Sequence, residues 1–294
     1  MSRRSVTILV VLAAMTFAAA FYAKERRSRL PVHVPLVSRT AANTGRERKA
    51  VNMAVAADVS SPARKRFSQR EYDLLWQRYK PNSGLADGPL SADRLDNLAT
   101  IVKNDTRDKK MWPVFRDVIY GNSAALENRL DTGLSADATI HLDYPYNASV
   151  SLLDMAIKAG QRDIIRELLR HNSSVGPLTE VAPDGTPLKV EAPLPLAAAD
   201  GEDDVVRLLL QSGADIEQGR AFRSNNQTAL DAAVTMQDVS TAYLLLSHGA
   251  DVNSALDPGG TVPSILIPPQ DAPPRMIALR DLLMEYGAKM PAGQ

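Results

Sequence analysis

The chain has 294 residues and no net charge, with 34 Lys and Arg against 34 Asp and Glu. It contains no cysteine, which excludes disulfides and thiol chemistry, and only 5% of it is aromatic, which favours a core of alanine and leucine over a sandwich or barrel. The charge is unevenly placed. Residues 1–70 hold 14 Lys and Arg against 3 Asp and Glu, and the rest of the chain holds 20 against 31, so we expect two segments with different roles.

The N-terminus carries a short basic stretch followed by an uncharged, mostly apolar one at residues 6–23. Its length lies between that of a long signal-peptide core and that of a short membrane span. The alanines at 18–20 offer a cleavage site, whereas the basic residues from Lys24 onward resist translocation. We therefore predict that residues 1–23 are a signal peptide or an N-terminal membrane anchor. The protein is then exported or anchored in the inner membrane facing the periplasm, with the cytosolic face as the alternative.

Residues 24–67 are predicted to form a basic flexible linker, because they combine scattered prolines and cations without sustained apolar periodicity. The basic clusters at 46–49 and 64–66 are compatible with anionic lipid or nucleic acid. A membrane-surface or nucleic-acid adaptor acting through residues 24–70 is therefore an alternative function. No aromatic residues alternate with these cations to stack on bases, so nucleic acid is not favoured.

Two helices are predicted within residues 68–110. Ser68 and Glu71 have the spacing of a capping box at the start of the first, and Pro81 and Gly84 end it. The second spans residues 91–103. We expect both to pack on the open end of the repeat units that follow, as a helical N-terminal cap.

The most informative stretch is residues 192–216. Leu194, Ala197 and Ala198 have the i, i+3, i+4 spacing of one helix face, and Gly201 can end that helix in the left-handed conformation. Residues 205–210 then form a second apolar face, which Gly213 ends. Two such short helices cannot bury these faces alone, so a stack of similar units is required.

The same pattern recurs along the chain. Residues 151–174 and 228–253 repeat it, residues 112–137 form a degenerate copy, and residues 276–288 keep only the second helix. The starts at 112, 151, 192 and 228 are 39, 41 and 36 residues apart. Helix pairs must keep nearly constant geometry to stack, so the differences in spacing must come from the loops between units.

These motifs resemble the ankyrin repeat. Pro193, Leu194 and the glycines at 201 and 213 fall on the family pattern, whereas Ala192 and Pro195 replace its Thr and His. The resemblance implies an all-α ankyrin-repeat solenoid over residues 111–290, with helix-turn-helix units joined by long loops. It also implies a non-enzymatic module that binds a partner protein through its concave face and finger loops. Some exported bacterial ankyrin proteins neutralise an enzyme beside them, and by that analogy the partner is inhibited.

The sequence shows no constellation of catalytic residues. The four histidines are dispersed, and neither a phosphate-binding loop nor a zinc-protease motif is present. Glu202, Asp203 and Asp204 occupy the first turn of a predicted helix, where carboxylates complement the helix dipole. We predict no enzyme activity, no cofactor and no metal. An enzyme with an unrecognised carboxylate site is the remaining alternative.

The predicted binding surface combines the loops at 139–147 and 217–226 with exposed positions of the first helices. Tyr and Arg are common interface hot spots, and the carboxylates would give a mostly acidic floor. We expect a monomer that binds a protein with a basic surface. The predicted partner-binding residues are His141, Asp143, Tyr144, Tyr146, Asp154, Lys158, Asp200, Arg220, Phe222, Arg223 and Asp231.

Overall fold

The computed structural model describes residues 69–81, 85–142, 148–181, 187–190, 192–219, 227–255 and 273–289. All of them belong to the second of two compact units, which begins at residue 60. The predicted anchor at 1–23 and linker at 24–67 lie outside the described residues. Within the described ranges, no helix is both long enough and apolar enough to cross a membrane.

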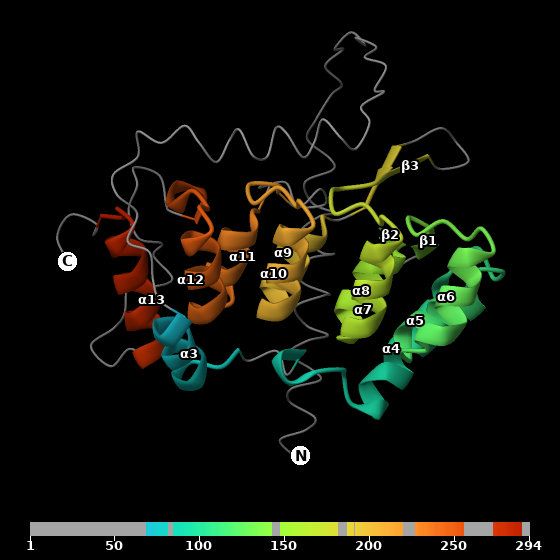
Figure 1. Cartoon of the computed structure of the whole chain (residues 1–294), viewed down its shortest axis with the longest axis horizontal. Helices are drawn as coiled ribbons and strands as arrows, with labels where there is room; N and C mark the ends of the chain where they lie inside the picture. The colour runs from blue at the N-terminus through green and yellow to red at the C-terminus, as the bar shows by residue number, and fades with distance from the viewer. Residues whose placement is uncertain are drawn as a thin grey trace, which may run out of the picture. The chain divides into compact units, whose positions relative to one another are not determined.

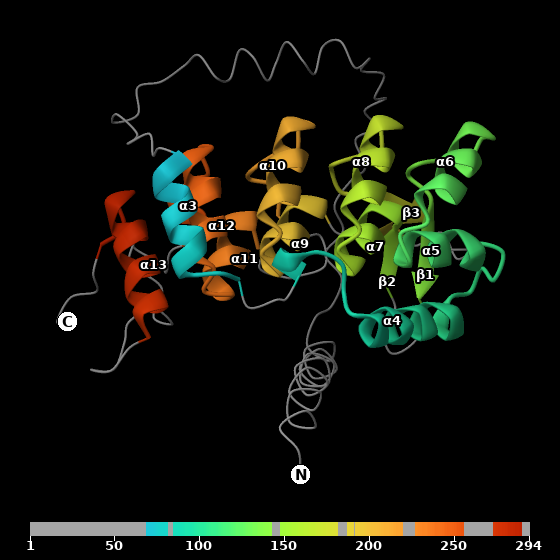
Figure 2. The same cartoon turned by 60° about the horizontal axis from the view of Figure 1, so that its bottom comes forward.

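Helix pairs make up most of the described chain, and each pair has an inner and an outer helix. The inner helices pack in the order α5, α7, α9, α11, and the outer helices α6, α8, α10 and α12 form a second row (Figures 1 and 2). This arrangement confirms the predicted all-α solenoid. The four pairs in the described residues are α5 (Trp112–Ile119) with α6 (Ser123–Asp131), α7 (Leu152–Ala159) with α8 (Arg162–Arg170), α9 (Pro193–Asp200) with α10 (Asp203–Gln211), and α11 (Ala229–Thr235) with α12 (Val239–Ser247).

Each inner helix ends at a residue with positive φ that turns the chain towards its outer helix. Gly160 has φ 70° and Gly201 has φ 68°, a conformation that costs glycine little because it has no Cβ. The fourth pair departs from this rule, since Gln237 takes the same conformation with φ 57°. The predicted glycine spacing thus marks the helix-to-helix turns of three pairs.

The core lies between the two rows of helices. Ala197 and Ala233 on the inner helices are fully buried, as are Leu168, Leu209 and Leu245 on the outer helices. Small alanine side chains let neighbouring inner helices approach closely, and the outer leucines fill the space between pairs. The burial of Leu209 confirms the register predicted for the third unit.

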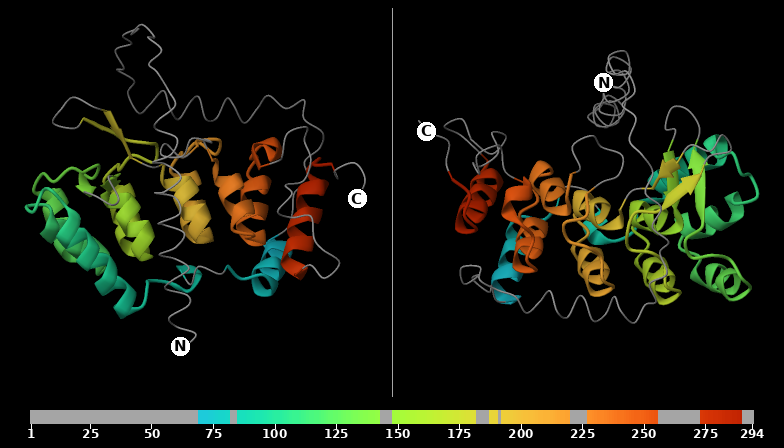
Figure 3. Two further views of the ribbon diagram at one scale, coloured as in Figure 1. Left: turned by 180° about the vertical axis from the view of Figure 1, so that it is seen from behind. Right: turned by 90° about the horizontal axis from the view of Figure 1, so that it is seen from above.

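Two β-hairpins extend from the N-terminal ends of inner helices α7 and α9 (Figure 3). In the first, β1 (Thr139–Leu142) pairs antiparallel with β2 (Ala148–Ser151). In the second, β3 (Thr179–Val181) pairs antiparallel with β4 (Pro187–Lys189). A single parallel bridge between Ser149 and Val190 connects the bases of the two hairpins.

The N-terminal helices occupy both ends of the repeat array. Helix α4 (Ala92–Asp105) packs on α5 of the first pair, as expected. Helix α3 (Gln69–Arg78) instead packs against α12 of the fourth pair, beside α10 (Figure 2). The expectation that both helices cover the first unit is therefore wrong for α3. It contacts Asp203 of the third pair through a hydrogen bond and Tyr243 of the fourth pair through its ring.

Residues 79–81 and 85–91, which we call the strap, connect α3 to α4 along the turns between inner and outer helices. The strap includes the short 3-10 helix η1 (Leu85–Asp87). A Cβ added to Gly201 would overlap Pro81, and one added to Gly160 would lie 2.8 Å from the carbonyl oxygen of Gly88. The strap therefore lies against two of the glycine turns at van der Waals distance.

The C-terminal helix completes the array. Helix α13 (Pro274–Glu285) packs on α12, and the 3-10 helix η2 (Val252–Ala255) packs on α11. The Arg275 guanidinium donates a hydrogen bond of 2.6 Å to the carbonyl oxygen of Lys80 in the strap. The two ends of the described chain are thus joined by a direct contact.

Candidate functional site

Pairing of β1 with β2 near the loop end of the first hairpin positions His141. Its Nδ1 lies 3.3 Å from the Ser149 hydroxyl on the paired strand, and its carbonyl oxygen accepts a hydrogen bond of 3.2 Å from the amide of Arg107. The side chain is half-buried. Three other predicted residues of this loop, Asp143, Tyr144 and Tyr146, lie outside the described residues.

Asp154 is not part of an exposed floor, which corrects the sequence-based expectation. Its side chain belongs to the third residue of α7, only 2% of the residue is exposed, and a carboxylate oxygen accepts from the amide of Ser151. The Ser151 hydroxyl in turn accepts from the Asp154 amide at 3.0 Å. This reciprocal capping box starts the helix, so the carboxylate is committed to local structure.

The other charged residues predicted on the inner helices are half-exposed but divided between two edges. Asp231 lies near the start of α11, where the Thr228 side chain accepts from its amide. Lys158 and Asp200 lie at the ends of α7 and α9, at the edge that the strap follows. The inner helices are about 10 Å long, so these residues do not form one acidic floor beside the hairpins. Arg220, Phe222 and Arg223 lie outside the described residues.

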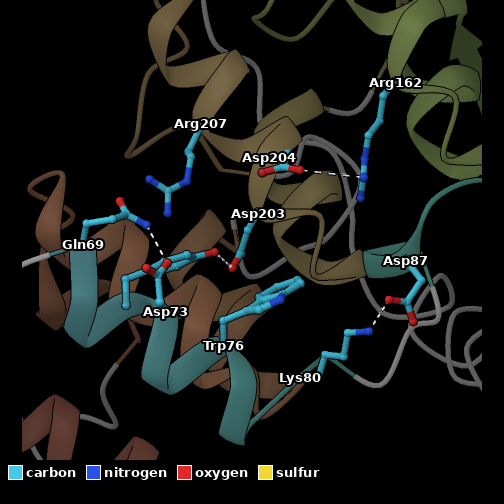
Figure 4. Close-up of a pocket in the computed structure, with 10 residues that line it drawn as sticks. Gln69, Asp73, Trp76, Lys80, Asp87, Arg162, Asp203, Asp204 and Arg207 are labelled. Atoms are coloured by element: carbon cyan, nitrogen blue, oxygen red, sulfur yellow. Dashed lines mark hydrogen bonds and ion pairs between the residues drawn. The ribbon is translucent and has the colours of Figure 1, made fainter.

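Sequence reasoning missed a second feature, a cleft of about 450 Å³ between α3 and the N-terminal ends of α8 and α10 (Figure 4). Its cations already have partners. Lys80 pairs with Asp87 in the strap, and Arg162 pairs with Glu202 at 3.1 Å and with Asp204 at 3.7 Å. These pairs lie within the strap or within the repeats, and Arg162 also joins the two by donating to the Leu85 carbonyl oxygen at 3.3 Å.

The Tyr72 hydroxyl on α3 lies at the floor of this cleft and donates a hydrogen bond of 2.5 Å to the Asp203 carboxylate. The Arg207 guanidinium lies 4.2 Å from the centre of the Tyr72 ring, a cation–π contact. On the far side of Asp203, the Thr241 hydroxyl donates to its second oxygen at 2.5 Å. Tyr72 thus connects α3 to α10 and, through Thr241, to α12.

Burial changes the acidity of the carboxylates beneath α3. It raises the pKa of Asp203 to about 6, together with the nearby Asp238 carboxylate and against the hydrogen bonds from Thr241 and Tyr72. Burial likewise raises the pKa of Glu202 to about 7, although Arg162 lowers it, and it raises the pKa of Asp238. Removing charged carboxylates from water favours their protonated forms.

These acidic groups are not presented to a substrate. Asp203 is 2% exposed and Glu202 is 0% exposed, whereas a general acid must reach the atom that it protonates. Asp204 of this first-turn trio is exposed, with 69% of its side chain accessible. Among the described residues, no group of acidic and histidine side chains has an arrangement that could hold a metal ion.

Comparison with known proteins agrees with this geometry. The family model described as ankyrin repeats matches three copies at residues 152–255, which cover the second to fourth helix pairs. Residues 152–255 are ankyrin repeats. This repeat type generally mediates protein–protein interaction and is generally not enzymatic.

Two curated proteins are similar to part of the chain. A putative ankyrin repeat-containing protein of Treponema pallidum (strain Nichols) is 31% identical over 145 residues, 48% of this chain and 43% of that protein. The FYVE zinc finger domain protein UPA1 of Mycosarcoma maydis is 30% identical over 133 residues, 45% of this chain and 10% of that protein. The chain therefore spans less than half the length of either relative.

Proposed function

We propose that this ankyrin-repeat protein binds a partner protein through the hairpin edge of its repeats and, by occupying the partner's surface, inhibits it. One observation carries the proposal. The hairpins extend from the N-terminal ends of the inner helices, and the strap follows the opposite ends of the same helices (Figure 1). The chain thus uses one edge of the array for its own strap and builds its long insertions at the other.

The residues proposed to contact the partner are those predicted on the loops, with Tyr144, Tyr146 and Phe222 as aromatic anchors. Aromatic side chains that become buried at an interface contribute large contact areas and dominate hot spots. Asp231 adds a carboxylate at the same edge of α11. The negative charge of this carboxylate favours a partner with a basic surface, because complementary charge steers association.

The test is a combined Tyr144→Ala, Tyr146→Ala and Phe222→Ala variant, with partner affinity and thermal unfolding measured together. We expect nearly unchanged unfolding and at least a tenfold loss of affinity, about 1.4 kcal/mol. Met236→Ala is the matched control, because Met236 is 50% exposed and lies in the turn at the strap edge.

Three results would contradict the proposal. Normal binding by the folded triple variant would exclude the hairpin edge as the contact surface. Unfolding of the triple variant would show that these aromatics belong to the core. Loss of binding only when Arg64, Lys65 and Arg66 are replaced, with steep dependence on salt, would indicate an adaptor acting through the basic segment.

We also propose export or membrane anchoring, supported by the uncharged segment at residues 6–23. The full-length protein should fractionate with membranes, or its mature form should begin near residue 20. Intact soluble protein that begins at Met1 and remains in the cytosol would contradict this proposal.

A further inference from the structure

Helix α3 is attached to the repeats mainly through one face and a few polar contacts. None of its residues is fully buried, and Leu74 is 58% exposed. Tyr72 provides the central contact, since it touches Asp203 through its hydroxyl and the Tyr243 ring at a centroid distance of 6.3 Å. A helix held in this way can separate from the array without opening the core between the repeat pairs.

Hydrogen atoms are too few in the cluster beneath Tyr72 unless one carboxyl group is protonated. The Thr241 oxygen lies 2.5 Å from an oxygen of Asp203 and 2.9 Å from an oxygen of Asp238. A hydroxyl group has a single hydrogen to donate, so it can satisfy only one of these acceptors. The other contact becomes a hydrogen bond when the second carboxyl group donates its own proton to Thr241.

The remaining donors do not remove this requirement. The Ser240 hydroxyl and the Thr241 amide both donate to the other oxygen of Asp238, and the Ser240 backbone also interacts with Asp238. The single hydrogen of the Ser240 hydroxyl is shared between Asp238 and Asp203, and Tyr72 donates to the other oxygen of Asp203. With one added proton, both contacts of the Thr241 hydroxyl in the docked cluster are therefore hydrogen bonds. Without that proton, two buried carboxylates repel each other across Thr241.

The charged groups around Asp203 come from every element that packs there. Helix α3 contributes Tyr72 and Asp73, and α10 contributes Asp204 and Arg207. Asp238 caps α12 and Arg162 begins α8. Tyr243 of α12 faces the Tyr72 ring, and Glu71 of α3 acts on Tyr243. The Arg162 charge is engaged by Glu202 and Asp204, and Arg207 lies over the Tyr72 ring. Neither cation forms an ion pair with Asp203 or Asp238 among the contacts of the described residues.

We infer that α3 is a proton-dependent latch: it closes on α10 and α12 when the cluster of Tyr72, Asp203, Thr241 and Asp238 holds one extra proton, and it opens when that proton is lost. Asp203 lies in the first turn of α10 and Asp238 caps α12, positions where ionised carboxylates are stable in water. Undocking α3 removes Tyr72 from Asp203 and returns the Asp203 carboxylate to such an environment.

The direction of the pH dependence follows from the acidity of the docked cluster. In the docked state burial outweighs the opposing hydrogen bond from Tyr72 and raises the pKa of Asp203 to about 6. Undocking exposes Asp203 to water and brings its pKa back towards the ordinary value of 3.8, so docking takes up a proton below about pH 6. The docking equilibrium constant should fall by up to about tenfold for each pH unit between about 4 and 6, and it should be constant at higher pH. Acid closes the latch, and neutral pH opens it.

Tryptophan fluorescence can follow the latch, because the chain has two tryptophans. Trp76 is on α3, 6.5 Å from the Tyr72 ring, and Trp112 begins α5. In a Trp112→Phe background of the full chain, acrylamide quenching of Trp76 should increase as the pH rises from 4.5 to 7. Circular dichroism should show the repeats folded throughout.

Two variants and one control identify the cluster. Asp203→Asn mimics the protonated carboxyl group and should keep Trp76 protected from the quencher at every pH. Tyr72→Phe removes the hydroxyl and should raise quenching even at pH 4.5. Asp73→Asn is the control, because Asp73 lines the same cleft but accepts only from Gln69 among the described contacts, so the pH dependence should stay as in the parent.

The latch is refuted if Trp76 quenching is independent of pH in the folded parent, or if its pH dependence persists in Asp203→Asn. Hydrogen exchange in the unmodified chain gives an independent measurement that needs no variant to fold. Protection of residues 69–78 should decrease relative to α7 as the pH rises to 6, after correction for the intrinsic exchange rate. Equal behaviour of the two helices would also overturn the inference.

Discussion

Substituting Gly160 with alanine tests whether the strap packs on the repeats. The added Cβ would lie 2.8 Å from the Gly88 carbonyl oxygen, 3.1 Å from Leu85 Cδ2 and 3.1 Å from Pro89 Cα. All three atoms belong to the strap, and two are in its backbone, so they cannot move aside by rotating a side chain. The substitution must therefore strain the inner-helix turn or displace the strap.

Gly133→Ala provides the matched control. Gly133 also has a positive φ, 107°, but an added Cβ there meets no atom within 4 Å. The control should cost about 1–2 kcal/mol, which is the left-handed penalty for a residue with a Cβ. Gly160→Ala should lose a further ~1–3 kcal/mol, the usual cost of overpacking.

Urea unfolding of the two variants, followed by circular dichroism, measures the difference. Hydrogen exchange should also show faster exchange at Leu90, whose amide donates to the Ala159 carbonyl oxygen at 3.2 Å, in Gly160→Ala but not in Gly133→Ala. Equal loss of stability in the two variants, with Leu90 still protected, would refute the packing of the strap on this turn.

Three further predictions concern stability. Burial raises the pKa of Glu202 from 4.5 to about 7, so the folded state binds a proton more tightly than the unfolded state. The unfolding free energy should therefore fall as the pH rises from about 4.5 to 7, on the order of 1–3 kcal/mol in total. In Glu202→Gln, urea titrations should show an unfolding free energy that depends less on pH. Leu209→Asp should cost about 3–5 kcal/mol by burying an unpaired charge, and an unchanged melting temperature would contradict the stacking register. Gln237→Gly should stabilise the fold by about 0.5 kcal/mol, because glycine relieves the left-handed strain at φ 57°; a lower melting temperature would argue against strain at this turn.

The repeats could be predicted from the sequence because their signals are local. Gly201 and the alanines before it indicate an inner helix and its end, and the leucines around Leu209 indicate the buried face of the outer helix. Each signal lies within a few residues of the element that it specifies. Similar units then pack with the same geometry, so the sequence pattern of one unit predicts the structure of its neighbours.

The position of α3 could not be predicted in this way. The helix itself was recognised from its capping box and apolar residues, but its partners Asp203 and Tyr243 lie far along the chain. A first-turn acidic residue such as Asp203 has the same local pattern whether it faces water or a tyrosine. The prediction that Asp154 is exposed was wrong for a related reason. Its carboxylate caps the backbone at the start of α7, and the helix pattern alone does not reveal that contact.

The route of the strap bears on how the protein forms during synthesis. Tyr72 is separated from Asp203 by 131 residues, and Lys80 from Arg275 by 195. Domains generally fold from the N-terminus as the chain emerges from the ribosome, yet the surface that receives α3 is made only after most of the repeats. Tyr72 therefore stays without its native partner Asp203 while the chain lengthens. Each repeat pair can stack on the one before it, but the N-terminal helix docks only when the fourth pair has left the ribosome.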